Sequence, residues 1–514
     1  MAVSERTPVL IGVGEASERL DEPSYAALSP ADLAGRAAQA ALGDANASAG
    51  AAGLARGIDV IAAIRQFEVS GPNARPPFGA ADNFPRAVGR RIGADPARAV
   101  LEVVGGQGPQ HLVGEFAHAI ARGEAEMVLL VGSEAISTVR ALAARGETRD
   151  WSETIGGQLE DRGFGPLSFI TRDLAQAGAR TPIQVYALFE NARRARLGLG
   201  RDAYRMEMAR LFAPFTAVAA DNPHAMAPRA LDPEALATIT PENRLTADPF
   251  PRRMVARDQA NQGAALLMTS VGKARALGVP EDRFVYLIGG ADVAERTPME
   301  REDLARSPAA VLASRRALEA AGLGPANVDG FDLYSCFAIA VFNICDGLGL
   351  APDDPRGLTV TGGLPFFGGA GNNYSMHAIA EMARRLRARP GSKGFVGANG
   401  GFLSKYSVGV YSSAPADWRP FESAGIQREV DAWSAPPRAE AYAGAATIET
   451  YTIDYSGPAP RAVVIARTPA GERLAAGSDA PEVVQAMIEA EPLAGRVEVR
   501  SDEGRGVIAE FRRA

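Results

Sequence analysis

The chain has 514 residues, of which 46% are hydrophobic and 22% are charged, a composition typical of a soluble globular protein with a large core. Its net charge of −7 excludes a protein that binds nucleic acid through a strongly basic surface. Two cysteines cannot form a disulfide framework, and no apolar stretch reaches the roughly 20 residues of a membrane span. We therefore expect a cytoplasmic protein with no membrane span and no nucleic-acid partner.

The same series of sequence features occurs twice along the chain. The tripeptide Leu-Ile-Gly at residues 10–12 returns at residues 287–289, and each copy continues to a Glu-Arg pair. A Ser-Pro pair follows in each copy, at Ser29 and at Ser307, where a serine N-cap and a proline in the first turn favour the start of a helix. Later matches keep the same order, so we predict a duplicated α/β unit with a site where the halves meet.

Strands and helices alternate within each copy, which predicts right-handed crossovers and a mostly parallel sheet. Two such units would form a five-layer αβαβα sandwich with shared middle helices. We assign residues 1–275 to the N-terminal half and residues 276–415 to the C-terminal half. The stretch from about residue 140 to residue 245 has no counterpart in the second copy, so we expect a helical insertion over the mouth of the site.

The character of the sequence changes after residue 415. Prolines mark a linker, and β-like runs follow, separated by turns, with a short helix expected near residues 481–490. We predict that residues 416–514 form an additional small β-rich domain. A barrel of the oligonucleotide-binding type is one form that this domain could take, although the sequence offers no basic face for nucleic acid.

A glycine-rich turn lies between a strand and a helix in each copy. Bare backbone amides at the N-terminus of a helix can hold a carbonyl oxygen that becomes negative. Tight packing of helix against sheet would explain any one of these glycines, but their paired placement favours a site. The turns supply these candidates for substrate binding: Gly105, Gly106, Gln107, Gly368, Gly369 and Asn372.

Further candidates lie at two other junctions and in one helix. We expect Cys336 in the first turn of a helix, where the dipole lowers the pKa of a thiol, although a small buried hydrophobe is an equal explanation. A polar asparagine beside two glycines indicates a site loop after a strand. The junctions and the helix supply the catalytic candidates Tyr334, Cys336, His377 and Asn399, together with Gly400 and Tyr406 for substrate binding.

Over roughly residues 8–414 the chain resembles the thiolase superfamily. Within it, the chain is most similar to the sterol-carrier-type thiolases and the type-1 thiolase-like proteins, which also carry an extra C-terminal domain. The resemblance implies the duplicated fold and an acyl-CoA substrate, with no cofactor beyond that thioester and no metal. Edge strands and apolar sheet faces would need covering, so we also expect a homodimer. The resemblance rests on residues 105–110, 332–337, 362–369 and 398–403.

The groups that thiolases use for acyl transfer are missing. The family's nucleophilic cysteine corresponds to Gly105 or Gly106, and its Gly-His-Pro motif is matched by Gly368-Gly369-Ala370. Its last cysteine motif falls near Asn399, and the histidine of its His-Asp-Cys-Phe run is replaced by Tyr334. Two-step acyl transfer needs a thiolate and a base, so the resemblance supports the fold and not the usual mechanism.

Two functions remain open. The first is a divergent enzyme that forms or cleaves C–C bonds of acyl-CoA thioesters by aldol-type chemistry, with Tyr334, His377 and Tyr406 as proton-transfer groups and Asn399 and the glycine-rich turns as oxyanion donors. A variant of this function moves the nucleophile to Cys336. The second is a non-catalytic protein that binds a CoA thioester or a lipid, or that serves as a scaffold.

Overall fold

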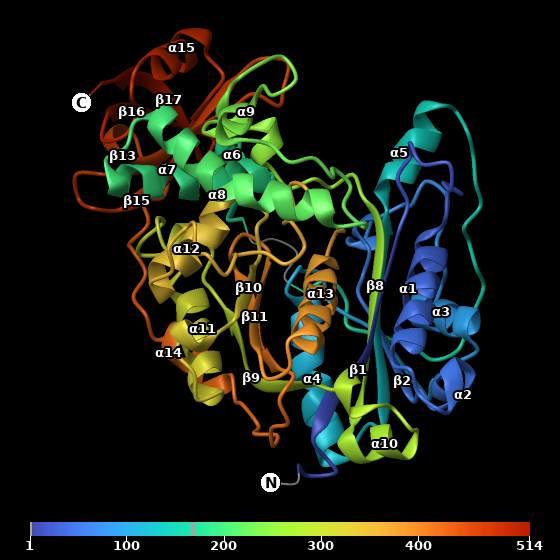
Figure 1. Ribbon diagram of the computed structural model, residues 1–514. Helices are drawn as coiled ribbons and strands as arrows, with labels where there is room; N and C mark the ends of the chain where they lie inside the picture. Colours follow the sequence, from blue (N-terminus) through green and yellow to red (C-terminus); the bar gives the residue numbers. More distant parts are fainter. Residues whose placement is uncertain (1–2, 166–169, 514) are drawn as a thin grey trace.

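The structure is a computed structural model that describes residues 3–165 and 170–513. Ten strands form one hydrogen-bonded series in the order β10-β11-β12-β9-β1-β8-β4-β2-β3-β5. The series curves so that two sheet faces look toward each other across two helices (Figure 1). Its strands are β1 (Pro8–Ser17), β2 (Val60–Ala63), β3 (Arg98–Leu101), β4 (Met127–Ala135), β5 (Glu160–Asp161), β8 (Asn261–Ser270), β9 (Val285–Ala294), β10 (Gly330–Leu333), β11 (Lys393–Gly400) and β12 (Lys405–Ser412).

The predicted duplication is confirmed by the strand pairings. The order β1-β8-β4-β2 is repeated as β9-β12-β11-β10, and each series has two antiparallel pairs followed by a parallel pair. The register slips at equivalent places, after Leu10 in β1 and after Leu287 in β9. A Cβ atom on Gly12 would lie 2.2 Å from a carbonyl oxygen of the covering helix, and one on Gly289 would meet its covering helix at the same 2.2 Å. Both halves therefore use a glycine to bring helix and strand close together.

The five layers are also confirmed. Helices α1 and α3 cover the first sheet, α4 and α13 lie between the sheets, and α11 and α12 cover the second sheet (Figure 1). The expectation of a mostly parallel sheet is wrong, because β8 and β12 run antiparallel to both neighbours. Only residues 401–404 join β11 to β12, a connection too short for a parallel crossover. Outside the insertion and the C-terminal barrel, the helices are α1 (Pro30–Asp44), α2 (Gly50–Arg56), α3 (Phe84–Ile92), α4 (Gly108–Arg122), α10 (Val271–Ala276), α11 (Pro308–Ala320), α12 (Ala338–Leu348), α13 (Tyr374–Ala388) and α14 (Ala424–Asp431).

Between β4 and β8 the described residues form helices and three short strands, β5, β6 and β7, that have no equivalent between β11 and β12. Figure 1 shows α6 to α9 between the two halves and the C-terminal domain. Among the described residues, no helix of this insertion or of the rest of the chain is long and apolar enough to cross a membrane. The elements are α5 (Ile136–Ala144), α6 (Arg172–Ala177), α7 (Pro182–Leu197), α8 (Arg201–Asp221), α9 (Pro233–Ala237), β6 (Leu245–Ala247) and β7 (Phe250–Pro251).

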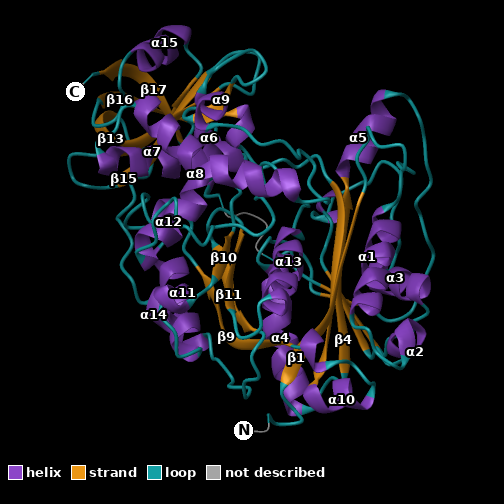
Figure 2. Cartoon of the chain, in the orientation of Figure 1, coloured by secondary structure: helices purple, strands orange, loops and turns teal. Residues whose placement is uncertain are grey.

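The C-terminal domain is a small barrel, as predicted (Figure 2). Its strands follow the order β14-β15-β17-β16-β13, and β13 pairs again with β14 to close the ring. Five strands with one helix between the third and fourth are typical of the oligonucleotide-binding barrel. Strand β6 of the insertion pairs with β13, so the two segments share a sheet. The elements are β13 (Gly444–Asp454), β14 (Arg461–Arg467), β15 (Arg473–Ser478), α15 (Pro481–Glu489), β16 (Arg496–Asp502) and β17 (Arg505–Arg512).

Candidate functional site

A cavity of about 570 Å³ lies where both halves meet the insertion. The first glycine-rich turn, the residues after β10, the end of β11 and the start of α7 form its walls. Because these segments belong to distant parts of the sequence, the duplicated fold brings them together. The predicted site residues that line the cavity are Gly105, Gly106, Tyr334, Cys336, Gly369, Asn372, Asn399 and Gly400.

His377 is not among the residues that line this cavity, so its role in proton transfer stays a prediction without support from the geometry. Its side chain is fully buried in α13, and its Nδ1 atom lies 2.6 Å from Oε1 of Glu15 on β1. Arg384 forms a second ion pair with Glu15. Although burial opposes ionisation, the contacts with His377 and Arg384 lower the pKa of Glu15 to about 2. The ionised Glu15 therefore holds His377 as a structural contact between the two halves.

Three further candidates also lie outside the cavity wall. Tyr406 packs within the sheet, where its hydroxyl would be 2.1 Å from a Cβ atom on Gly397. Gly368 faces Gln262, whose Oε1 atom would lie 2.6 Å from a Cβ atom at that position. Gln107 lines a different, shallower cavity of about 370 Å³ behind the first glycine-rich turn. None of the three is among the residues that line the cavity, so their contact with substrate stays a prediction.

The structure does not give Cys336 the lowered pKa that we expected. Helix α12 begins at Ala338, so the thiol precedes the first turn and gains little from the helix dipole. Burial raises the pKa of Cys336 to about 12. At neutral pH the side chain is therefore a neutral thiol inside the cavity, and it is poorly suited to act as a nucleophile.

No space exists at the first glycine-rich turn for the side chain that thiolases carry there. A Cβ atom on Gly106 would lie 2.2 Å from the hydroxyl oxygen of Tyr334 and 2.6 Å from the carbonyl oxygen of Asn399. Gly105 has a φ of 148°, which a residue with a side chain rarely adopts. Its amide donates a hydrogen bond of 3.1 Å to Oδ1 of Asn372, so the second turn fixes the first. The Tyr334 hydroxyl thus fills the space beside Gly106.

Sequence reasoning missed Tyr186, which enters the cavity from α7 of the insertion. Its hydroxyl accepts hydrogen bonds from Nδ2 of Asn399 at 2.8 Å and from the amide of Leu403 at 3.2 Å. Its ring stacks on Phe337 with centroids 4.4 Å apart. Asn399 therefore uses one amide hydrogen to orient the Tyr186 hydroxyl, while it also lines the cavity. Only the aromatic character of this insertion helix could have signalled Tyr186, because the second half has no equivalent helix.

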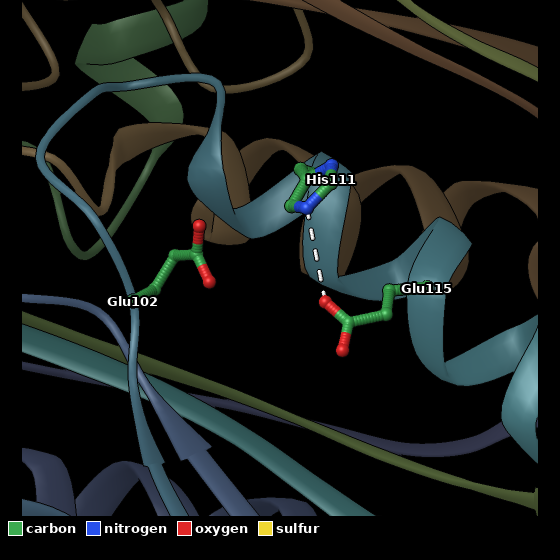
Figure 3. Close-up of side chains that lie close together, drawn as sticks. All are labelled: Glu102, His111 and Glu115. Carbon is green, nitrogen blue, oxygen red and sulfur yellow. Dashed lines mark ion pairs between the residues drawn. The ribbon is translucent and has the colours of Figure 1, made fainter. Parts of the chain in front are cut away.

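Figure 3 shows a group outside the cavity that offers metal-ligand atoms: Glu102, His111 and Glu115, with those atoms within 4.8 Å of one another. Arg162 already pairs with both carboxylates at 2.7 Å. Nδ1 of His111 lies 3.4 Å from Oδ2 of Asp292 on β9. We therefore interpret the group as an ion-pair network that joins α4 to the second half.

This network predicts a pH-dependent contribution of His111 to stability. Burial opposes protonation, but the hydrogen bond and charge of Asp292 outweigh it and raise the pKa of His111 to about 9. A raised pKa means that protonation stabilises the folded state, fully below the unfolded pKa of about 6.5 and no longer above about 9. We expect wild type to exceed His111→Gln in unfolding free energy at pH 6 and to lose that advantage by pH 10. Urea unfolding at both pH values measures the difference, and a constant difference would contradict the assignment.

Two family models match the chain. Thiolase C-terminal domain-like matches residues 290–414, and thiolase-like protein type 1 additional C-terminal domain matches residues 425–504. The second match coincides with the barrel. No curated protein matches the chain.

The solved structures include one with high similarity over the whole chain. It is a monomeric SCP2-thiolase like protein type 1 from Mycobacterium smegmatis, with 45% identity, a TM-score of 0.85, and coverage of 99% of this chain and 100% of that chain. The acetyl-CoA acetyltransferase of Syntrophomonas wolfei has 15% identity and a TM-score of 0.54, and the match covers 79% of this chain and 99% of that chain. The Ltp2-ChsH2(DUF35) aldolase has 19% identity and a TM-score of 0.58, and it covers 79% of this chain and 98% of its own.

The two distant structures show the shared fold alone, whereas the first relative decides the family. That relative is described as monomeric, so the homodimer that we expected is not supported. With 45% identity across 99% of its length, this chain belongs to the SCP2-thiolase-like proteins of type 1, within the thiolase superfamily.

Proposed function

We propose that this protein binds a coenzyme A thioester in the cavity between its halves. The acyl part would lie against the apolar and aromatic side chains of the wall, among them Phe337, Leu364 and Phe402. A second cavity of about 400 Å³ shares Ile183 and Val255 with the first, so it forms a continuation toward the surface. A long ligand with an apolar end and a polar end would fit this pair of cavities.

The observation that carries the proposal is the charge of the second cavity. Arg229, Arg252 and Arg257 line it, and within residues 3–165 and 170–513 none of them forms an ion pair. Burial, followed by the charge of Arg252, lowers the pKa of Arg257, and the charge of Asp258 opposes this effect only in part. Guanidinium groups bind phosphate oxygens with paired hydrogen bonds. The cavity is also lined by Glu242 and Asp258, but its arginines outnumber these two acidic side chains, and the phosphates of coenzyme A would balance the excess positive charge.

Calorimetry with coenzyme A tests the proposal. We expect Arg252→Gln and Arg257→Gln each to weaken affinity by about tenfold or more, because each removes a charged hydrogen-bond donor. Arg316→Gln is the control, because Arg316 lies on α11 and pairs with exposed Glu319. Wild-type protein that binds neither coenzyme A nor acetyl-CoA at millimolar concentration would exclude this function.

Acyl transfer through a covalent cysteine is not part of the proposal, because the cavity offers a neutral buried thiol at Cys336 and His377 lies elsewhere. A second candidate function is aldol-type chemistry on the bound thioester. It is favoured by the hydroxyl of Tyr334, which lies at Gly106 inside the cavity. Tyr334 is the proton-transfer group of our sequence prediction that the cavity retains.

We also expect a monomer in solution. Strand β5 of the insertion pairs with β3, from Val100 opposite Glu160 to Leu101 opposite Asp161, and so covers part of an edge that a second copy could otherwise use. The relative with 45% identity is described as monomeric. Light scattering at micromolar concentration should give a mass near 53.8 kDa. A mass twice that value would contradict the monomer and support the homodimer instead.

A further inference from the structure

The barrel contains a buried arginine that contacts the rest of the chain through backbone carbonyl groups. Arg473 on β15 has no exposed surface, and it pairs with Glu449 on β13 at 2.5 Å. Its guanidinium also donates to the carbonyl oxygens of Met299 and Glu302, both at 3.2 Å, and to that of Arg301. One side chain of the barrel therefore fixes the backbone of the segment 299–302.

The side chain of Arg301 connects this segment to the loop that follows β11. It is 3% exposed, and it donates to the carbonyl oxygens of Phe402 at 2.7 Å and Leu403 at 2.9 Å. It also lies over the ring of Phe189, 4.8 Å from the centroid. In the described part of the chain, no carboxylate lies within ion-pair distance of its guanidinium, and its Nη1 atom is buried without a hydrogen-bond partner. Burial of a guanidinium costs free energy unless hydrogen bonds or an opposite charge compensate for the lost water, so the bonds to these carbonyl groups are what holds Arg301 in place.

Those contacts hold a short loop in an unfavourable backbone conformation. Residues 401–404 connect β11 to β12, and Leu403 has a φ of 53° in the left-handed region. A leucine adopts that region only where its surroundings impose it. Gly401 and Phe402 line the cavity, so the conformation of the loop sets the shape of one wall.

The barrel also fixes the helix that forms the opposite part of the wall. Thr450 on β13 donates a hydrogen bond of 2.5 Å to the carbonyl oxygen of Leu188, and Asn191 donates one of 2.9 Å to the carbonyl oxygen of Tyr451. Both contacts lie on α7, which carries Tyr186. The hydroxyl of Tyr186 in turn bonds to Leu403, so both routes from the barrel end at the same loop.

We propose that the C-terminal barrel supports the wall of the ligand cavity from behind, and that Arg473 and Arg301 are positioning residues that hold loop 401–404 in its binding conformation. The barrel uses β15 and β13 for these contacts within the chain. The statement about the loop stands on contacts alone, whereas its consequence for affinity rests on the proposed binding of a CoA thioester.

Hydrogen exchange followed by mass spectrometry tests the proposal in the full-length protein without any ligand. We expect Arg473→Gln and Arg301→Gln each to speed exchange in a peptide spanning residues 399–406 by about tenfold or more, because the loop opens locally. Exchange in the central strand β4 serves as the reference for global unfolding. Arg467→Gln is the matched control, because Arg467 also pairs with Glu449, at 3.0 Å, but lies on the partly exposed side of the barrel.

If Arg473→Gln fails to fold, Arg473→Lys keeps the charge beside Glu449 but cannot reach all the carbonyl groups, and it should give a smaller increase in the same peptide. Unchanged exchange at residues 399–406 in both Arg473→Lys and Arg301→Gln would overturn the proposal. Affinity for coenzyme A, measured on the same variants, should fall with the loss of protection. Wild-type protein that binds no coenzyme A would exclude the proposed function and leave the exchange result to decide the role of the barrel.

Discussion

Gly369→Leu should abolish binding of acetyl-CoA, whereas Gly369→Ala should retain most of it. Gly369 lines the cavity. A Cβ atom added at this position would lie 3.2 Å from the carbonyl oxygen of Arg257 and 3.4 Å from Cδ2 of Leu364. A methyl group therefore requires only a small shift. The remaining carbons of leucine would extend into the cavity and displace the ligand.

Calorimetry with acetyl-CoA measures this effect, and circular dichroism confirms that each variant is folded. We expect affinity to fall by at least about a hundredfold in Gly369→Leu, because filling a ligand's space forfeits most of its contacts. The backbone hydrogen bond from Gly369 to Arg257, 2.8 Å long, is retained by both variants. Wild-type affinity in a folded Gly369→Leu protein would mean that the ligand binds elsewhere.

Local sequence patterns predicted the fold because they repeat and have a simple physical cause. The Leu-Ile-Gly tripeptides mark equivalent strands, and their glycines meet equivalent helices at 2.2 Å. Strand β15 carries no such signal, because Ala475, Ala476 and Gly477 are poor strand formers. That strand exists because the barrel surrounds it, and all of its residues are buried. Tertiary packing therefore overrode a weak local preference.

The site was harder to predict than the fold because side-chain direction depends on distant partners. Asn372 and Asn399 line the cavity, but their hydrogen bonds run to Gly105 and to Tyr186, far away in the sequence. His377 lies in the expected helix, yet its side chain turns toward Glu15 of the other half. No local pattern signals either choice. Burial reversed the pKa expected for Cys336 in the same way, since it depends on walls from several segments.

Tyr334→Phe tests whether the cavity catalyses a reaction as well as binding a thioester. In retro-aldol cleavage of a 3-hydroxyacyl thioester, the bond between C2 and C3 breaks and its electrons form an enolate at the thioester. The 3-hydroxyl group loses a proton and becomes a carbonyl, while C2 gains a proton. Because a neutral phenol is a poor base, Tyr334 would act as a relay in a concerted step: it accepts the proton of the 3-hydroxyl group while it passes its own proton to C2, so the protons balance and the phenol ends neutral. Burial, followed by the Cys336 thiol, raises the pKa of Tyr334 above its ordinary value, which keeps the phenol protonated at neutral pH.

We therefore expect Tyr334→Phe to lower kcat for a 3-hydroxyacyl-CoA by about 10²- to 10⁴-fold, the usual contribution of a positioned proton-transfer group. KM should change little, because the phenyl ring still fills its place in the wall. Tyr406→Phe is the matched control: it removes a hydroxyl that is also buried but packs against Gly397 outside the cavity, so turnover should stay at the wild-type level. Equal turnover in wild type and Tyr334→Phe would remove Tyr334 from the mechanism. If the protein binds 3-hydroxyacyl thioesters but turns over none of a panel, the cavity is a binding site and Tyr334 transfers no proton.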